Sequence, residues 1–292
     1  MGSPCEIQLF ARSERDARRV AALAIADVER LEARYSRYRD DSLLSNINRV
    51  AAHGGSLTVD DETASLLNYA ATCHTQSDGL FDITSGILRR AWRFASGELP
   101  DSAQIDALRE HIGWHRIIWE APLLSFPQAG MELDFGGVVK EYAVDRAATL
   151  CRDAGLIHGV VNLGGDIKIV GPRADGSPWR IGIKHPRARE AVLETVELQA
   201  GALATSGDYE RCIVLDGQRY GHILNPRTGW PVRKLAAVSV VADFCVIAGS
   251  ASSIAMLKED AGPAWLAELG LRHLWVDVDG CSGGDLLIES ST

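Results

Sequence analysis

The chain has 292 residues, of which 46% are hydrophobic and 24% charged, a balance typical of a globular protein with a substantial core. Its formal net charge of −9, from 30 basic and 39 acidic residues, argues against a general nucleic-acid binder but leaves room for an anionic ligand held by local cations. No stretch approaches the roughly 20 apolar residues of a transmembrane helix, so no membrane span is expected.

The cysteines and the N-terminal charge pattern bear on the compartment. No two of the 6 cysteines form a Cys-x-x-Cys pair, and several lie in apolar contexts, so we expect buried thiols in a reducing compartment. Charged residues begin at Glu6 and no signal peptide is visible, which favours a cytoplasmic location. A periplasmic protein supplied without its leader would have the same sequence, so that alternative stays open.

The first part of the chain predicts one strand followed by helices. Alternating apolar and polar residues indicate a strand over residues 5–10. Apolar residues then recur at spacings of three and four from Ala17 to Tyr35, which predicts an amphipathic helix over residues 14–35. A shorter helix is expected near residues 42–49 and another over residues 61–77.

The remainder of the chain predicts short strands with helices between them. We expect a strand at 132–135, a helix over 138–153 and a buried strand at 160–163. Later elements are strands at 179–183, 192–198, 211–215, 219–224 and 238–241, helices over 247–258 and from Pro263, and a strand pair of 273–278 with 285–289. Because regular βαβ alternation is missing, the sequence predicts a single α+β domain over residues 1–292, with a mixed, mainly antiparallel sheet and interleaved helices.

The segment His222–Gly229 concentrates polar chemistry in a short turn. It reads His-Ile-Leu-Asn-Pro-Arg-Thr-Gly, with an imidazole, an amide, a guanidinium and a hydroxyl beside Pro226 and Gly229. Proline fixes one backbone angle and glycine frees another, so the turn is closely specified. Two interpretations follow: an ordinary hairpin loop, or one wall of a site for a polar ligand.

Paired glycines occur twice after expected strands, at Gly136-Gly137 and within Asn162–Asp166. Such pairs let backbone N–H groups approach a ligand, and the helix expected after Gly137 could hold a phosphate at its N-terminus, with Lys140 in the first turn. Tight turns are the alternative interpretation. The sequence contains no P-loop, no local Ser-His-Asp signature and no zinc-type spacing of His and Cys.

Several carboxylates and hydroxyls lie beside these turns. Asp78, Asp82 and Asp134 each adjoin a glycine or an aromatic residue, where a carboxylate could bind a ligand's N–H or hydroxyl group or could cap a turn. The segment Thr205–Tyr209 adds two aliphatic hydroxyls, a phenol and a carboxylate in one loop.

Taken in order, these segments resemble the ApbE family of flavin transferases. The resemblance extends from residue 1 to residue 258, so it covers most of the chain. Each motif is short, but their order is specific. The matching segments are Met1–Ser3, Ser36–Ser42, Asp78–Thr84, Asp134–Lys140, Asn162–Ile167, Ala204–Arg211 and His222–Gly229.

The resemblance implies that the protein binds FAD and transfers its FMN half to a threonine hydroxyl of an acceptor flavoprotein, releasing AMP, with magnesium neutralising the phosphates. Some relatives instead hydrolyse FAD to FMN and AMP. His222 is implied to assist proton transfer from the acceptor threonine, with a structural hydrogen bond at the loop mouth as its alternative role. The residues implied to surround FAD are Met1, Tyr38, Leu80, Phe81, Asp82, Asp134, Lys140 and Ile223.

The implied magnesium site departs from the family pattern. The family has an Ala-Asp-Ala-x-x-Thr helix whose Asp and Thr side chains bind the ion, together with a carbonyl group from the paired glycines. Here Gly249 stands at the aspartate position, Ser253 keeps the hydroxyl and Gly137 would supply the carbonyl. Because magnesium is normally held by at least one carboxylate, we expect a weakened site. Glu141, where many relatives have glycine, could supply charge from the neighbouring helix.

Three hypotheses follow from this departure. The protein is an FMN transferase with an adapted metal site, an FAD-binding carrier or accessory protein that has lost transfer, or an FAD pyrophosphatase. If the missing carboxylate is a defect, Gly249→Asp is expected to raise activity.

Overall fold

The computed structural model describes residues 4–188 and 190–287. Its central element is a seven-stranded antiparallel sheet with the strand order β1-β5-β6-β9-β12-β13-β14. The strands of this main sheet are β1 (Cys5–Leu9), β5 (Gly159–Leu163), β6 (Asp166–Gly171), β9 (Ala202–Gly207), β12 (Leu235–Ala242), β13 (Arg272–Asp277) and β14 (Ser282–Gly283).

Smaller sheets and the helices surround the main sheet. The smaller sheets pair β7 (Trp179–Lys184) with β8 (Val192–Leu198), β10 (Cys212–Leu215) with β11 (Gln218–Gly221), and β4 (Leu123–Phe126) with β2 (Gly55–Thr58) and β3 (Ile118–Glu120). The α-helices are α1 (Glu14–Tyr35), α2 (Leu43–His53), α3 (Asp61–Gln76), α4 (Ser102–Arg109), α5 (Val139–Asp153), α6 (Cys245–Lys258) and α7 (Gly262–Glu268). Short 3-10 helices are η1 (Ile83–Arg90), η2 (Trp114–Arg116) and η3 (Glu259–Ala261). The predicted α+β class with antiparallel sheets is confirmed.

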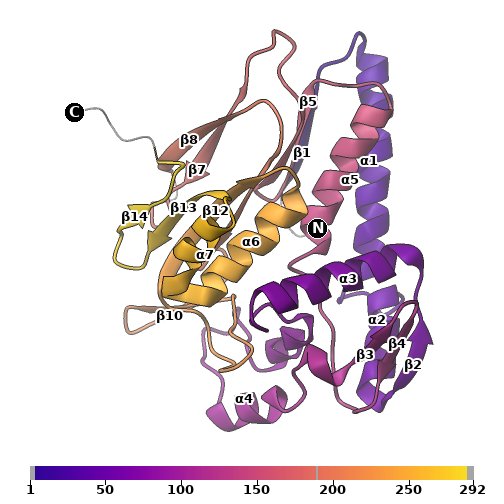
Figure 1. Ribbon diagram of the computed structural model, residues 1–292, viewed down its shortest axis with the longest axis vertical. Coiled ribbons are helices and arrows are strands. Elements are labelled where there is room, and N and C mark those ends of the chain that lie inside the picture. The colour runs from indigo at the N-terminus through magenta and orange to yellow at the C-terminus, as the bar shows by residue number, and fades with distance from the viewer. Residues whose placement is uncertain (1–3, 189, 288–292) are drawn as a thin grey trace.

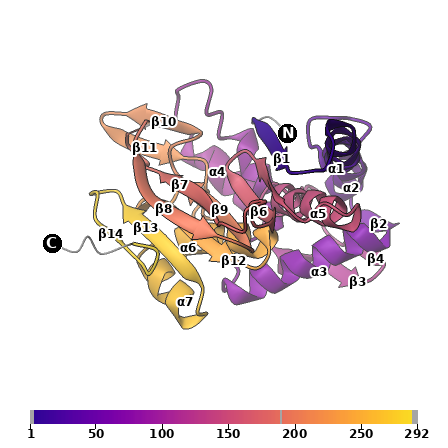
Figure 2. The same cartoon turned by 90° about the horizontal axis from the view of Figure 1, so that it is seen from above.

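The main sheet is covered on both faces. Helices α5 and α6 pack on one face, and α1 packs against α5 (Figure 1). The hairpin of β7 and β8 packs on the other face, where Trp179 and Val196 meet Ile169 and Leu203 of the sheet (Figure 2). The central strands are therefore buried on both sides, which is why β12 does not alternate and is apolar except for Ser239, whose hydroxyl pairs with that of Thr205.

Helices α1, α2 and α3 begin at side-chain caps. Ser13, Ser42 and Asp60 each accept a hydrogen bond from the backbone N–H three residues further along the chain. Each cap satisfies an amide group that the first helical turn leaves without a partner. The start of α1 predicted from Ser13 is confirmed by this contact.

Helix α6 begins in a different way, with its cap supplied by α5. Phe244 stands at its N-cap and has no hydrogen-bonding side chain. Instead, the Asp145 carboxylate of α5 accepts from Cys245 N and Val246 N at 2.8 and 2.9 Å. Burial raises the pKa of Asp145, and these two bonds oppose that effect. The contact fixes how α6 lies along α5 and hence which residues of the two helices face each other.

Replacing Asp145 by alanine is expected to lower the free energy of unfolding by about 2–4 kcal/mol, because two buried N–H groups lose their acceptor. Asp145→Asn keeps one acceptor oxygen and should lose less. Urea denaturation followed by circular dichroism at pH 7 measures both. An alanine variant as stable as the wild type would show that the cap contributes nothing.

Several predicted elements differ from the structure. Residues 132–135, predicted as a strand, run as an irregular segment in which Asp134 N donates to Ile83 O of η1 at 2.8 Å. The strand predicted to 224 ends at Gly221, and Leu224 forms an isolated bridge with Pro231. On the side away from β12, β13 pairs with β14. Of the predicted strand 285–289, residues 285–287 form no strand, although Leu286 N donates to His273 O at 3.1 Å, and 288 and 289 lie outside the described residues.

The cysteines follow the prediction only in part. Cys73, Cys151 and Cys245 are buried as expected, whereas Cys5 and Cys281 are exposed. None of the helices within the described ranges combines the length and apolar character needed to cross a membrane.

Candidate functional site

The loop before α5 joins two of the residues predicted to bind FAD. Asp134 Oδ1 accepts from Gly136 N at 2.9 Å, and Oδ2 forms an ion pair with Arg37. Arg37 in turn donates to Tyr38 Oη at 2.9 Å, and this hydrogen bond lowers the pKa of Tyr38. Tyr38 is 75% exposed, so its ring presents an open aromatic face beside a fixed positive charge.

The segment Asp78–Thr84 packs against the paired glycines. A Cβ on Gly137 would lie 3.2 Å from Phe81 Cζ, so the buried ring and the loop are already in close contact. The carboxylate of Asp82 accepts from Thr84 N and Trp114 N at 2.8 and 2.9 Å. Asp82 therefore caps η1, which is the turn-capping alternative left open by the sequence.

Lys140, in the first turn of α5, lies between two buried carboxylates. Its Nζ forms an ion pair with Asp166 and lies 3.5 Å from Glu141 Oε1. Burial raises the pKa of Glu141 to about 7, an effect that Lys140 opposes. Burial alone would lower the pKa of Lys140, but the Glu141 and Asp166 charges together raise it, so Lys140 stays a cation.

Hydroxyl groups border this cluster. Asp166 Oδ1 accepts a long hydrogen bond of 3.4 Å from Thr205 N of β9. The next residue, Ser206, places its Oγ 2.8 and 2.9 Å from the Oγ atoms of Ser252 and Ser253 on α6. The predicted metal residue Ser253 therefore contacts β9, whose Thr205 donates to Asp166 of β6.

Gly249 faces Glu141 across the α5–α6 contact. A Cβ at residue 249 would lie 2.4 Å from Glu141 Cγ and 3.3 Å from its Oε1. The Glu141 side chain therefore fills the space beside Gly249. The side chain introduced by Gly249→Asp would overlap Glu141 in its present position, so the gain in activity expected from this variant requires Glu141 to move.

The backbone of the His222–Gly229 segment follows the hairpin interpretation. Asn225 organises its tip: Asn225 Oδ1 accepts from Arg227 N at 2.9 Å, and Asn225 O accepts from Gly229 N at 2.7 Å. Gly229 has a φ of 72°, and a Cβ there would lie 2.3 Å from Ile105 Cγ2, so only glycine fits. Arg227 extends from this rigid tip and donates to the Asp78 carbonyl.

His222 lies at the mouth of this hairpin with an exposed residue surface. Its pKa is lowered from 6.5, first by partial desolvation and then by the charge of Arg211, with a further contribution from Lys140. The same Arg211 charge also lowers the pKa of Tyr38. The lowered pKa favours a neutral imidazole at pH 7.

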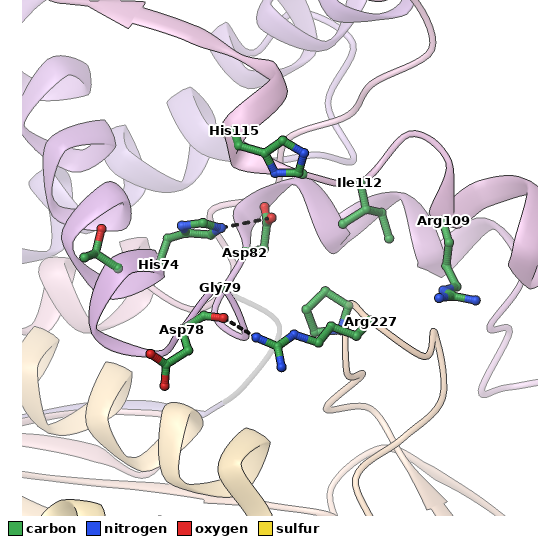
Figure 3. Close-up of a pocket in the computed structure, with 11 residues that line it drawn as sticks. His74, Asp78, Gly79, Asp82, Arg109, Ile112, His115 and Arg227 are labelled. Carbon is green, nitrogen blue, oxygen red and sulfur yellow. Dashed lines mark hydrogen bonds and ion pairs between the residues drawn. The ribbon is translucent and has the colours of Figure 1, made fainter.

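A cavity of about 570 Å³ lies where the segment Asp78–Thr84 meets the His222–Gly229 hairpin (Figure 3). In its wall, His74 Nε2 lies 3.6 Å from Asp82 Oδ2, and Arg227 reaches the Asp78 carbonyl. The lining residues are His74, Thr75, Asp78, Gly79, Asp82, Arg109, Ile112, Gly113, His115, Pro226 and Arg227. Two motifs that are far apart in the sequence therefore share one concave surface.

Of the remaining predicted residues, those that the structure describes make no polar contact that defines the site. Leu80 and Ile223 are partly buried and pack against the main core, and Met1 lies outside the described residues. Sequence reasoning missed Arg37, Asp166 and Arg211 as charged members of the site. Each lies inside one of the motifs that resemble the family, so its position in the sequence could have identified it. Its partners lie far away in the sequence and could not be predicted from the motif.

Comparisons with known proteins identify the family of the chain. The family model described as the ApbE family matches residues 1–275. The FAD:protein FMN transferase of Vibrio cholerae serotype O1 is 31% identical over 246 residues, 81% of this chain and 73% of that protein. The crystal structure of the ApbE protein from Thermotoga maritima has a TM-score of 0.87 and 30% identity, and the match covers 97% of this chain and 94% of that one. The apo flavinyl transferase ApbE of Pseudomonas stutzeri has a TM-score of 0.84 and 29% identity, covering 97% and 90%. With the motifs in order and the fold shared over nearly its whole length, this chain belongs to the ApbE family.

Proposed function

We propose that this protein binds FAD and transfers FMN to a threonine hydroxyl of an acceptor protein, releasing AMP. The observation that carries the proposal is the position of Arg37, Tyr38 and Lys140 at the start of α5, where Arg37 pairs with Asp134 and donates to the exposed Tyr38, and Lys140 lies in the first helical turn. The names of the relatives, which are FAD:protein FMN transferases, support the substrate and the type of reaction.

The reaction requires a general base for the threonine proton and positive charge that offsets the negative charge of the pyrophosphate. The threonine Oγ attacks the phosphorus of the FMN half, a new P–O bond forms, and the P–O bond to AMP breaks. Neutral His222 takes the proton from the threonine Oγ, and AMP leaves as the free phosphate monoester. Lys140 and Arg37 are positioned to oppose the negative charge of the pyrophosphate.

The residues at the start of α5 also fit a magnesium ion. Within the described residues, Glu141 Oε2 is buried and has no hydrogen-bond partner, and an oxygen of this kind is a ligand that magnesium prefers. Ser253 Oγ and the Gly137 carbonyl are the other groups that would hold the ion. When bound, magnesium neutralises charge on the phosphates.

Incubation with FAD, magnesium and a threonine-bearing acceptor flavoprotein tests the proposal. Transfer gives in-gel flavin fluorescence on the acceptor, a mass increase of one FMN, and equimolar AMP. An acceptor whose threonine is replaced by valine is the control. AMP with free FMN would identify a pyrophosphatase. Tight FAD binding without AMP release would identify a carrier and reject the transferase.

The activity is expected to fall only below pH 6.5, because the pKa of His222 is lowered from that value and the base acts in its deprotonated form. Activity therefore rises with pH through the depressed pKa and stays constant above it. A pH profile of kcat/KM for transfer measures this acid limb. An acid limb that persists unchanged in His222→Ala would contradict the assignment, because a second titrating group such as Glu141 would then account for it.

A further inference from the structure

The buried carboxylate of Glu141 has one oxygen that no donor in the described residues reaches. Glu141 is 6% exposed, and its Oε2 has no hydrogen-bond partner within residues 4–188 and 190–287. Its Oε1 lies 3.5 Å from Lys140 Nζ. A buried carboxylate oxygen without a donor is costly, so this atom marks a position where a cation would bind favourably.

The space for this carboxylate exists because residue 249 is a glycine. A Cβ on Gly249 would lie 2.4 Å from Glu141 Cγ and 3.1 Å from Cδ. A side chain at 249 and the Glu141 side chain in its present position therefore exclude each other. The Asp145 cap holds α5 and α6 in the alignment that brings these two residues together.

Other oxygen groups stand around the same point. Asp166, 2% exposed, reaches the cluster from β6 and shares Lys140 with Glu141. Ser253 lies one turn along α6 from Gly249, on the same side of the helix. No group of three or more His, Cys, Asp or Glu in the described part of the chain is arranged to hold a metal, so hydroxyl and carbonyl oxygens would complete the set.

We propose that Glu141 and Gly249 are a reciprocal pair, in which the carboxylate of the divalent-cation site is supplied by α5 because α6 carries a glycine. Glu141 is then a magnesium ligand in place of the aspartate expected at residue 249. The identity of the ion rests on the proposed function. The site is a rearranged cation site and not one that has lost its carboxylate.

A four-variant cycle tests the pair: wild type, Glu141→Gly, Gly249→Asp and the double swap. Mn²⁺ is the probe, and its affinity is measured by electron paramagnetic resonance with and without saturating FAD. We expect Glu141→Gly to weaken Mn²⁺ binding at least about tenfold, since it removes a charged ligand. The double swap returns a carboxylate from the α6 side and should restore most of that affinity.

Thermal unfolding gives a readout that is independent of metal and activity. Gly249→Ala is expected to lower Tm by several degrees in the wild type, because its Cβ overlaps Glu141. In the Glu141→Gly background the same change should leave Tm unchanged or raise it, because the space is then empty. Glu141→Gln keeps the side-chain shape without the charge, so it should retain stability and lose Mn²⁺ affinity.

The possible results separate this inference from the proposed function. Wild-type Mn²⁺ affinity in Glu141→Gln, or a Gly249→Asp protein that is both stable and tighter for Mn²⁺, would overturn the reciprocal pair even if FMN transfer is observed. Mn²⁺ binding that depends on Glu141 in a protein that transfers no FMN would uphold the pair and reject the transferase. Wild type that binds no Mn²⁺ in either state would also overturn the pair.

Discussion

Replacing His222 by alanine is expected to slow FMN transfer by about 10²–10⁴-fold, the usual contribution of a positioned general base. FAD affinity should change little, because the proposed role of the imidazole concerns the threonine proton and not the flavin. Stability should also be unaffected, since His222 is exposed. Single-turnover transfer, FAD titration and thermal unfolding measure the three quantities separately.

His222→Asn is the matched control for that prediction. Asparagine can preserve a hydrogen bond at the mouth of the hairpin but cannot accept the threonine proton at neutral pH. If the role is catalytic, the asparagine variant is nearly as slow as the alanine variant. Transfer close to the wild-type rate in His222→Asn would assign His222 a structural hydrogen bond instead.

Replacing Lys140 by methionine is expected to cost about 2–3 kcal/mol of stability at pH 8, because Glu141 and Asp166 remain buried without their shared counter-charge. The loss is smaller than for a fully buried pair, because the Lys140 side chain is 34% exposed and solvent screens its charge. FAD affinity should fall by about 10–100-fold through loss of a charged contact to phosphate.

The stability loss in Lys140→Met should depend on pH. Without the ammonium, the carboxylates have folded-state pKa values above their unfolded ones, so the native state binds more protons and the loss grows as pH rises. Urea denaturation at pH 5 and pH 8 measures it, and Lys140→Arg is the control that keeps the charge. An equal loss at both pH values would show that Lys140 contributes by packing alone.

The fold could be predicted where local pattern decides structure. The helix over residues 14–35 has the bounds of α1, because its apolar spacing and its Ser13 cap both lie within the segment. Strands β6 and β9 were missed, because they are held by neighbours distant in the sequence. Residues 132–135 have strand-like composition, yet Asp134 bonds to η1, a tertiary contact that no local pattern reveals.

The site was predictable as a set of motifs but not as a set of partners. Tyr38, Asp134 and Lys140 were identified from motif order, whereas the connection of the first two through Arg37 required the structure. Gly249 was identified as a departure, but its meaning changed once Glu141 was seen to occupy the space beside it. Sequence position cannot show that the Glu141 side chain occupies the space that a side chain at residue 249 would need.

The alignment of α5 with α6 also has a consequence for the order of folding. Asp145 lies 100 residues before Cys245, whose amide it binds, and Arg37 lies 97 residues before Asp134. We expect contacts of such long sequence separation to form after local ones. Closing a large loop costs chain entropy, and this cost is offset only once the contact has formed. We therefore expect the candidate site to form after the local structure of its helices. A bound flavin would mainly slow unfolding and would have little effect on the folding rate.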